Sequence, residues 1–139
     1  MLEDAPMTAQ DALVALMIAM SASDENIRTA ELVKMSNAIN NLPVFAGYDA
    51  ERLPRMSKMV FELLEPVDGL EALFGLIRDA LPEHLYETAY ALSCDVAAAD
   101  GKIVGQEARM LEEIRDELSI DRLNAAAIER GARARHMTL

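Results

Sequence analysis

Apolar residues recur every three or four positions over most of this chain, which is the spacing of one face of an α-helix. The first such run opens at Thr8, where Asp11 three residues later completes a capping-box pattern, and its apolar face continues to Met20. A second run follows an acidic turn and stops at Pro43. Together the two runs predict a helical hairpin over residues 10–42.

The same pattern returns later in the chain. Leu16 and Met20 of the first run correspond to Leu92 and Val96 when the sequence is shifted by 76 positions. A second acidic turn and another helical run follow at the same offset. We therefore expect a second hairpin over residues 86–118 that is equivalent to the first.

The remaining stretches complete an all-α protein of about seven helices. Residues 49–81 hold two apolar stripes separated by Pro66, and Pro54 fits the first turn of the earlier stripe because an interior proline would break a helix. Asp68 and Asp121 are candidate N-caps for the helices that follow them. The predicted architecture is two pseudo-repeat hairpins, a middle helix pair and a C-terminal helix.

Composition supports one helical domain. Apolar residues make up 52% of the 139 positions and aromatics only 4%, which favours packed helices over sheets. We expect a flexible tail at 1–7 and a single domain at 8–139. Cys94 is the only cysteine, so no internal disulfide is possible, and its apolar neighbours predict a small buried side chain.

The formal net charge of −11 means that nucleic-acid phosphates and anionic membrane surfaces would be repelled. We expect no nucleic-acid binding, and instead protein partners or metal ions, with a monomer or weak dimer as the oligomeric state. One basic cluster stands out, and cations there suit the negative end of the last helix. Its members are Arg130, Arg133, Arg135 and His136.

The apolar run Ala12–Ala22 resembles the core of an export signal. However, no lysine or arginine precedes it, whereas export signals begin with positive charge. It is also shorter than the roughly 20 apolar residues that span a bilayer. We therefore expect no membrane insertion and a cytoplasmic location.

The most distinctive feature is an acidic phrase that occurs twice. Asp24-Glu25-Asn26-Ile27 is followed after three residues by Glu31, and Asp100-Gly101-Lys102-Ile103 is followed at the same spacing by Glu107. Each phrase lies at the turn of one predicted hairpin. Facing hairpins would bring four carboxylates together, with Asp95 one turn earlier as a further candidate ligand. The four are Asp24, Glu31, Asp100 and Glu107.

Such a cluster has only oxygen donors, which select hard cations such as Ca²⁺, Mg²⁺ or Mn²⁺ over Zn²⁺. The second phrase also overlays the later part of an EF-hand loop. The first two ligand positions of that loop would be Val96 and Ala98, whose side chains cannot coordinate. A self-contained EF-hand is therefore excluded, and any bound ion needs ligands from both phrases.

Helix capping is a competing explanation, because glutamate is favoured at the third position of a helix and aspartate is favoured in turns. The residues at the expected N-cap positions, Arg28 and Val104, supply no standard side-chain cap. This favours a site for an ion or a basic partner over capping alone.

Residues 97–107, Ala-Ala-Ala-Asp-Gly-Lys-Ile-Val-Gly-Gln-Glu, and the doubled hairpin pattern resemble the bacterial TerB-like family of tellurite-resistance and stress-response proteins. They also resemble the related N-terminal domain of the DjlA co-chaperones. The resemblance covers residues 8–135, although Glu25 stands where glycine is usual. It implies a compact seven-helix domain of two similar halves, with an acidic metal-binding cluster at the carboxylates named above.

Three functions are consistent with these features. The leading hypothesis is a non-enzymatic stress-response binding module whose acidic turns hold a divalent cation or a basic partner segment. The first alternative is a metal-dependent hydrolase that uses the same carboxylates. The second is a metal-free scaffold that docks partners through a methionine-rich groove. Catalysis has little support, because the sequence has no HExxH, CxxC or glycine-rich phosphate loop.

Overall fold

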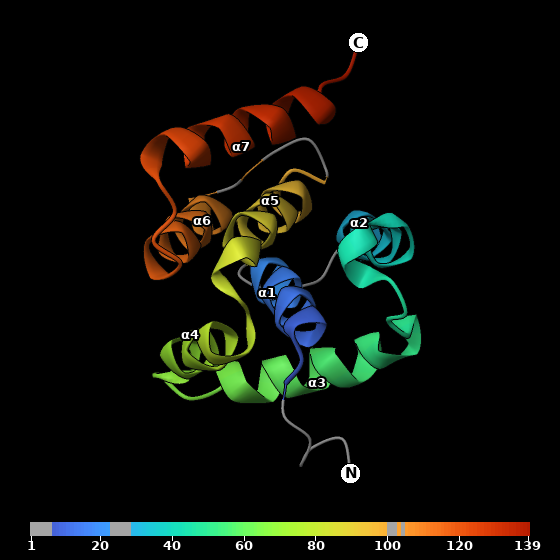
Figure 1. Cartoon of the computed structure of the whole chain (residues 1–139), viewed down its shortest axis with the longest axis vertical. Helices are drawn as coiled ribbons and strands as arrows, with labels where there is room; N and C mark the ends of the chain where they lie inside the picture. Colours follow the sequence, from blue (N-terminus) through green and yellow to red (C-terminus); the bar gives the residue numbers. More distant parts are fainter. Residues whose placement is uncertain (1–6, 23–28, 100–102, 104) are drawn as a thin grey trace.

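The computed structural model describes residues 7–22, 29–99, 103 and 105–139. These residues form seven α-helices, three short 3₁₀ helices and no strand (Figure 1). The α-helices are α1 (Ala9–Ala22), α2 (Thr29–Asn41), α3 (Leu53–Leu64), α4 (Gly69–Ala80), α5 (Tyr86–Ala97), α6 (Gly105–Glu117) and α7 (Arg122–Arg135). The 3₁₀ helices are η2 (Pro43–Phe45), η3 (Ala50–Arg52) and η4 (Glu83–Leu85). The predicted all-α architecture is confirmed.

The helix bounds repeat along the chain as the sequence predicts. Shifting α2 by 76 positions gives residues 105–117, which are the bounds of α6. The same shift places α1 at residues 85–98, within one residue of α5 at each end. The two hairpins are therefore equivalent units separated by α3 and α4.

Helix α1, the first helix of the first hairpin, lies at the centre of the fold, and the two hairpins contact each other. Helix α1 lies against α3, α4 and α5, and every side chain from Asp11 to Ser21 is buried. The second helix of each hairpin contacts the first helix of the other, since α2 packs against α5 and α6 packs against α1. Helix α1 is apolar on all sides because neighbouring helices surround it.

Local signals place most of the helix starts. Thr8 and Asp11 form the predicted capping box, in which the Thr8 N–H donates to Asp11 Oδ2 at 3.2 Å and the Asp11 N–H donates to Thr8 Oγ1 at 3.0 Å. Pro54 lies in the first turn of α3, and the Asp121 carboxylate accepts from two N–H groups of α7. Asp68 is different. It stands at the N-cap of α4 without a capping hydrogen bond, because its backbone is not in the extended conformation that aims the carboxylate at the helix.

The boundary between the expected tail and the domain stays a prediction. Residues 1–6 of the predicted tail lie outside the described residues, and Met7 is half-buried against the core. Across the helices with described placement, none combines the length and apolar character needed to cross a membrane.

Candidate functional site

The predicted acidic site is only partly visible. Asp24 and Asp100 lie outside the described residues, so the convergence of four carboxylates remains a prediction. Glu31 and Glu107 are the third residues of α2 and α6, with exposed fractions of 1% and 0%. Among residues with described placement, no group of three or more His, Cys, Asp or Glu side chains is arranged to hold a metal ion.

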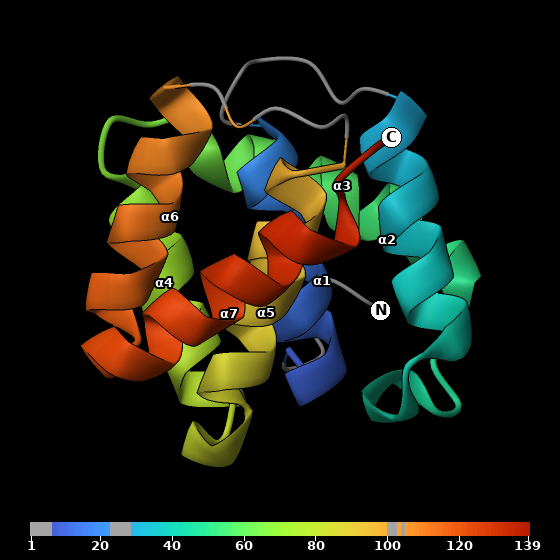
Figure 2. The same ribbon diagram turned by 90° about the horizontal axis from the view of Figure 1, so that it is seen from above.

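Helix packing brings the starts of α2 and α6 to one end of the molecule. Figure 2 shows these N-terminal ends beside the C-terminal ends of α1 and α5. Glu31 and Glu107 therefore occupy equivalent, buried positions near that end. A carboxylate in the first helical turn is favoured by the helix dipole, which reduces the cost of burying it.

Asp95, the fifth predicted ligand, is engaged elsewhere. It lies on α5, and its Oδ1 accepts a hydrogen bond from Arg135 Nη2 of α7 at 2.6 Å. The side chain of Asp95 is 22% exposed and that of Arg135 is 54% exposed, so solvent screens this ion pair. The contact ties α7 to α5.

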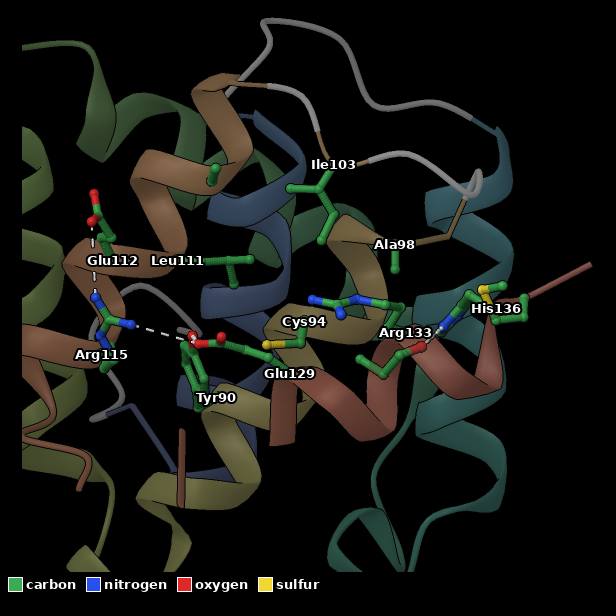
Figure 3. A pocket seen from close by; sticks show the side chains of 13 residues that line it. Tyr90, Cys94, Ala98, Ile103, Leu111, Glu112, Arg115, Glu129, Arg133 and His136 are labelled. Atoms are coloured by element: carbon green, nitrogen blue, oxygen red, sulfur yellow. Dashed lines mark hydrogen bonds and ion pairs between the residues drawn. The ribbon is translucent and has the colours of Figure 1, made fainter. Parts of the chain in front are cut away.

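A pocket of about 520 Å³ lies between α5, α6 and α7 (Figure 3). Small or apolar side chains from all three helices and from the segments beside them form much of its wall. These include Cys94, Ala98, Ile103, Leu111, Ala132 and Met137. Helices α5 and α7 pack closely, and α6 flanks α5, so the pocket sits in a junction of three helices.

One end of the pocket holds a closed polar network. The Tyr90 hydroxyl donates a hydrogen bond to Glu129 Oε2. Arg115 approaches the same oxygen at 3.7 Å and Glu112 Oε1 at 3.9 Å. Burial, together with the hydrogen bond to Glu129, raises the pKa of Tyr90, so the hydroxyl stays protonated at neutral pH.

Cys94 lies in the same wall with an exposed fraction of 1%, which confirms the predicted buried cysteine. Burial and the nearby negative charge of Glu129 raise the pKa of the Cys94 thiol to about 12. The thiol is therefore protonated at neutral pH and a weak nucleophile.

The other end of the pocket is open and basic. Arg133 forms no ion pair with any described residue, and its guanidinium extends from α7 across the pocket toward Ile103 (Figure 3). His136 Nδ1 lies 2.7 Å from the Ala132 carbonyl oxygen, which can only accept, so Nδ1 is the donor. His136 Nε2 is buried and has no hydrogen-bond partner within the described part of the chain.

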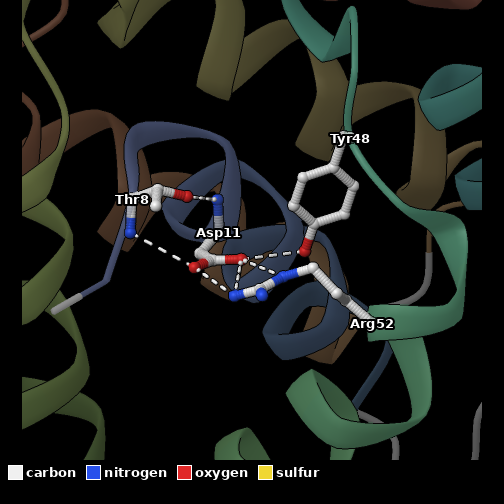
Figure 4. Close-up of polar contacts among 4 residues, drawn as sticks. All are labelled: Thr8, Asp11, Tyr48 and Arg52. Carbon is white, nitrogen blue, oxygen red and sulfur yellow. Dashed lines mark hydrogen bonds and ion pairs between the residues drawn. The ribbon is translucent and has the colours of Figure 1, made fainter. Parts of the chain in front are cut away.

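A second buried polar cluster, at the start of α1, is structural (Figure 4). Asp11 accepts hydrogen bonds from the Thr8 N–H, the Tyr48 hydroxyl at 2.9 Å and Arg52 at 2.8 to 3.2 Å. Burial alone would raise the pKa of Asp11, but these hydrogen bonds and the charge of Arg52 hold it below its usual value. Burial and the hydrogen bond to Asp11 raise the pKa of Tyr48 to about 12. Each group in the cluster is satisfied by the others, which leaves nothing to bind a ligand.

Sequence reasoning did not anticipate the pocket. The basic residues of the last helix were expected only to complement its dipole. The available signal was the spacing of Glu129, Arg133 and His136, which places them on one face of α7. That spacing does not say which helix the face meets.

The fold and its paired hairpins define an all-helical domain with an internal repeat. A comparison with protein families identifies the family to which this domain belongs. Residues 10–130 match the family model described as tellurite resistance protein TerB. The chain therefore belongs to the TerB family, as its acidic phrases suggested. No curated protein and no solved structure shows a significant match to it.

Proposed function

We propose that this TerB-family chain is a non-enzymatic stress-response binding module whose acidic turns hold a divalent cation or a basic partner segment. The observation that carries the proposal is the equivalence of Glu31 and Glu107. They occupy the third position of α2 and of α6, both are buried, and both helices start at the same end of the molecule.

Burying a carboxylate removes its hydration, which costs several kcal/mol unless other charges or hydrogen bonds compensate. Helix dipoles offset part of this cost at Glu31 and Glu107. A divalent cation at that end of the molecule would add a further favourable interaction with both carboxylates. Carboxylate oxygens are the donors that Ca²⁺, Mg²⁺ and Mn²⁺ prefer, so these ions are the expected occupants.

The two alternative functions have weaker support. A metal-dependent hydrolase needs an open pocket beside the acidic turns, and Ala98 and Ile103, which flank the second turn, do line the pocket. However, the carboxylates of that pocket already interact with Arg115 or Tyr90. A methionine-rich docking groove is not supported either, because half of the eight described methionines are buried in the core. These are Met17, Met20, Met35 and Met56.

Thermal unfolding with and without millimolar Ca²⁺, Mg²⁺ or Mn²⁺ tests the proposal. A ligand at 100 times its Kd stabilises a protein by about 2.7 kcal/mol, which corresponds to a rise in Tm of roughly 10 °C for a domain of this size. We expect such a rise in the wild type and a much smaller one in Glu31→Gln/Glu107→Gln. The matched control is Glu112→Gln/Glu113→Gln, which removes two exposed charges from α6.

The change in Tm on adding the ion is the informative quantity, because the double variant has its own starting stability. A lysine-rich peptide, titrated by calorimetry, tests the basic-partner form of the proposal on the same proteins. Identical responses to ions and peptide in the wild type and in Glu31→Gln/Glu107→Gln would contradict the proposal. Capping would then be the better explanation of these residues.

A further inference from the structure

We propose that the pocket between α5, α6 and α7 binds a small amphipathic carboxylic acid, a ligand with an apolar body and a single acidic group. The inference goes beyond the proposed function, because the pocket uses neither Glu31 nor Glu107. Three features of the described residues support it: the size and lining of the pocket, Arg133 without an ion-pair partner among them, and His136 Nε2 without a hydrogen-bond partner among them.

The pocket has the dimensions and surface of a small-molecule site. Its volume of about 520 Å³ lies within the range of roughly 300–1,000 Å³ that such sites occupy. Leu111, Cys94 and Ala132 form a buried apolar floor, and Ile103 and Met137 are apolar residues with exposed fractions of 48% and 71%. An apolar ligand body would remove this surface from water, which is favourable.

The charge of α7 makes the pocket unusual in this acidic protein. Helix α7 carries four arginines and one glutamate, a net charge of +3, in a chain with a net charge of −11. Arg115 and Arg135 are paired with acidic side chains, whereas Arg133 has no such partner among the described residues. Because its guanidinium reaches across the pocket, Arg133 is placed to pair with an anionic ligand group (Figure 3).

His136 supplies a second polar contact. Its Nδ1 donates to the Ala132 carbonyl oxygen, which fixes the ring and leaves Nε2 as the other polar atom of the side chain. Nε2 is buried without a hydrogen-bond partner in the described chain, and a buried polar atom of this kind is normally satisfied. A carboxylate that pairs with Arg133 can accept a hydrogen bond from Nε2 when the ring is protonated.

The same residues argue against other ligand classes. A ligand with several negative charges, such as a nucleotide, would meet Glu112 and Glu129 in the pocket and, among the described lining residues, a single arginine without an ion-pair partner. A cationic ligand would be repelled by Arg133. One negative charge on an apolar body matches what the pocket offers.

Heteronuclear NMR titrations of the full chain with decanoate, decanol and decyltrimethylammonium test the ligand class. The three probes share a chain length and differ in charge. We expect saturable shifts for Cys94, Leu111 and Ala132 with decanoate, and affinity at least roughly tenfold weaker for decanol, because a hydrogen bond to a charged group contributes that much. Equal affinity for decanol and decanoate, or no saturable shifts at millimolar decanoate, would overturn the proposal.

Two pairs of variants locate the binding. Arg133→Ala should weaken decanoate binding roughly tenfold, whereas Arg130→Ala, on the same helix but outside the pocket lining, should leave it unchanged. Ala108→Phe fills the pocket from an exposed position on α6 and should abolish binding, whereas Ala126→Phe on the exposed face of α7 should not. Circular dichroism checks that each variant is folded. Undiminished binding to both Arg133→Ala and Ala108→Phe would show that decanoate binds elsewhere.

Discussion

Replacing Asp11 with asparagine is expected to lower the free energy of unfolding by about 2–4 kcal/mol. Asp11 is 3% exposed and accepts hydrogen bonds from the Thr8 N–H, the Tyr48 hydroxyl and the Arg52 guanidinium. Asparagine keeps the shape of the side chain but loses the charge. In either orientation its amide nitrogen would also face Arg52, which can only donate.

The magnitude follows from the partners that would be lost. A hydrogen bond to a charged group contributes about 1.5–3 kcal/mol, and an N-terminal cap contributes about 1 kcal/mol. Breaking a fully buried ion pair costs about 3–5 kcal/mol, but the Arg52 side chain is 28% exposed, so water recovers part of that cost. We therefore expect Asp11→Asn to lower the free energy of unfolding by about 2–4 kcal/mol, between the loss of one charged hydrogen bond and that of a fully buried ion pair.

The effect should also depend on pH in a defined direction. The pKa of Asp11 is lowered in the folded state, so the carboxylate stabilises the fold above its unfolded pKa of about 3.9. That contribution is lost as the pH falls through the folded value. The difference between wild type and Asp11→Asn should therefore be largest near pH 7 and narrow below about pH 4.

Urea unfolding, followed by circular dichroism near pH 7 and below about pH 4, measures the loss in the free energy of unfolding and its change with pH. Asp49→Asn is the matched control, because the Asp49 side chain is exposed and, among the described residues, accepts only from the Glu51 N–H. The control should lose no more than about 1 kcal/mol. A loss below about 1 kcal/mol for Asp11→Asn, or a loss that does not change with pH, would refute the reasoning.

Two further predictions concern the cysteine and the glycines. Cys94 should react with a thiol reagent in the native protein at a small fraction of its rate in denaturant, because the thiol is buried and its pKa is raised to about 12. Absorbance of the released reagent group measures both rates. Equal rates would show that the pocket wall opens freely. Gly69→Ala should destabilise the fold by more than about 1 kcal/mol, because a Cβ there would lie 2.1 Å from the Leu63 carbonyl oxygen. Gly75→Ala should instead stabilise the fold by about 0.5–1 kcal/mol. Nothing lies within 4 Å of a Cβ at Gly75, and alanine is the better helix former. Urea unfolding compares the two variants, and an equal effect of both would contradict the assigned close approach at Gly69.

Much of the fold was predictable because it rests on local patterns. The 76-residue offset, carried by the repeated acidic phrase and the apolar spacing, placed α5 and α6 within one residue of α1 and α2 shifted along the chain. Thr8 with Asp11 and the side chain of Asp121 cap helices as expected, since capping depends on residues only two or three positions apart. Asp68 shows the limit of this reasoning, because its capping required a backbone conformation that residue identity does not impose.

The sequence placed Glu31 and Glu107 at equivalent helix positions, whereas their surroundings depend on the tertiary structure. The matched positions of Glu31 and Glu107 followed from the repeat, but their nearly complete burial did not. Burial depends on how α2 crosses α5 and how α6 crosses α1, and apolar periodicity tells which face of a helix is covered without telling what covers it.

Local sequence patterns account for the helices, the caps at Thr8 and Asp121 and the internal repeat, because each depends mainly on groups close together in the chain. Tertiary structure alone decided that Asp11 meets Arg52, 41 positions away, and that Tyr90 meets Glu129, 39 positions away. It also decided that one face of α7 closes a pocket with α5 and α6. These contacts depend on the angles and offsets at which helices pack, and many side-chain patterns are compatible with several such packings.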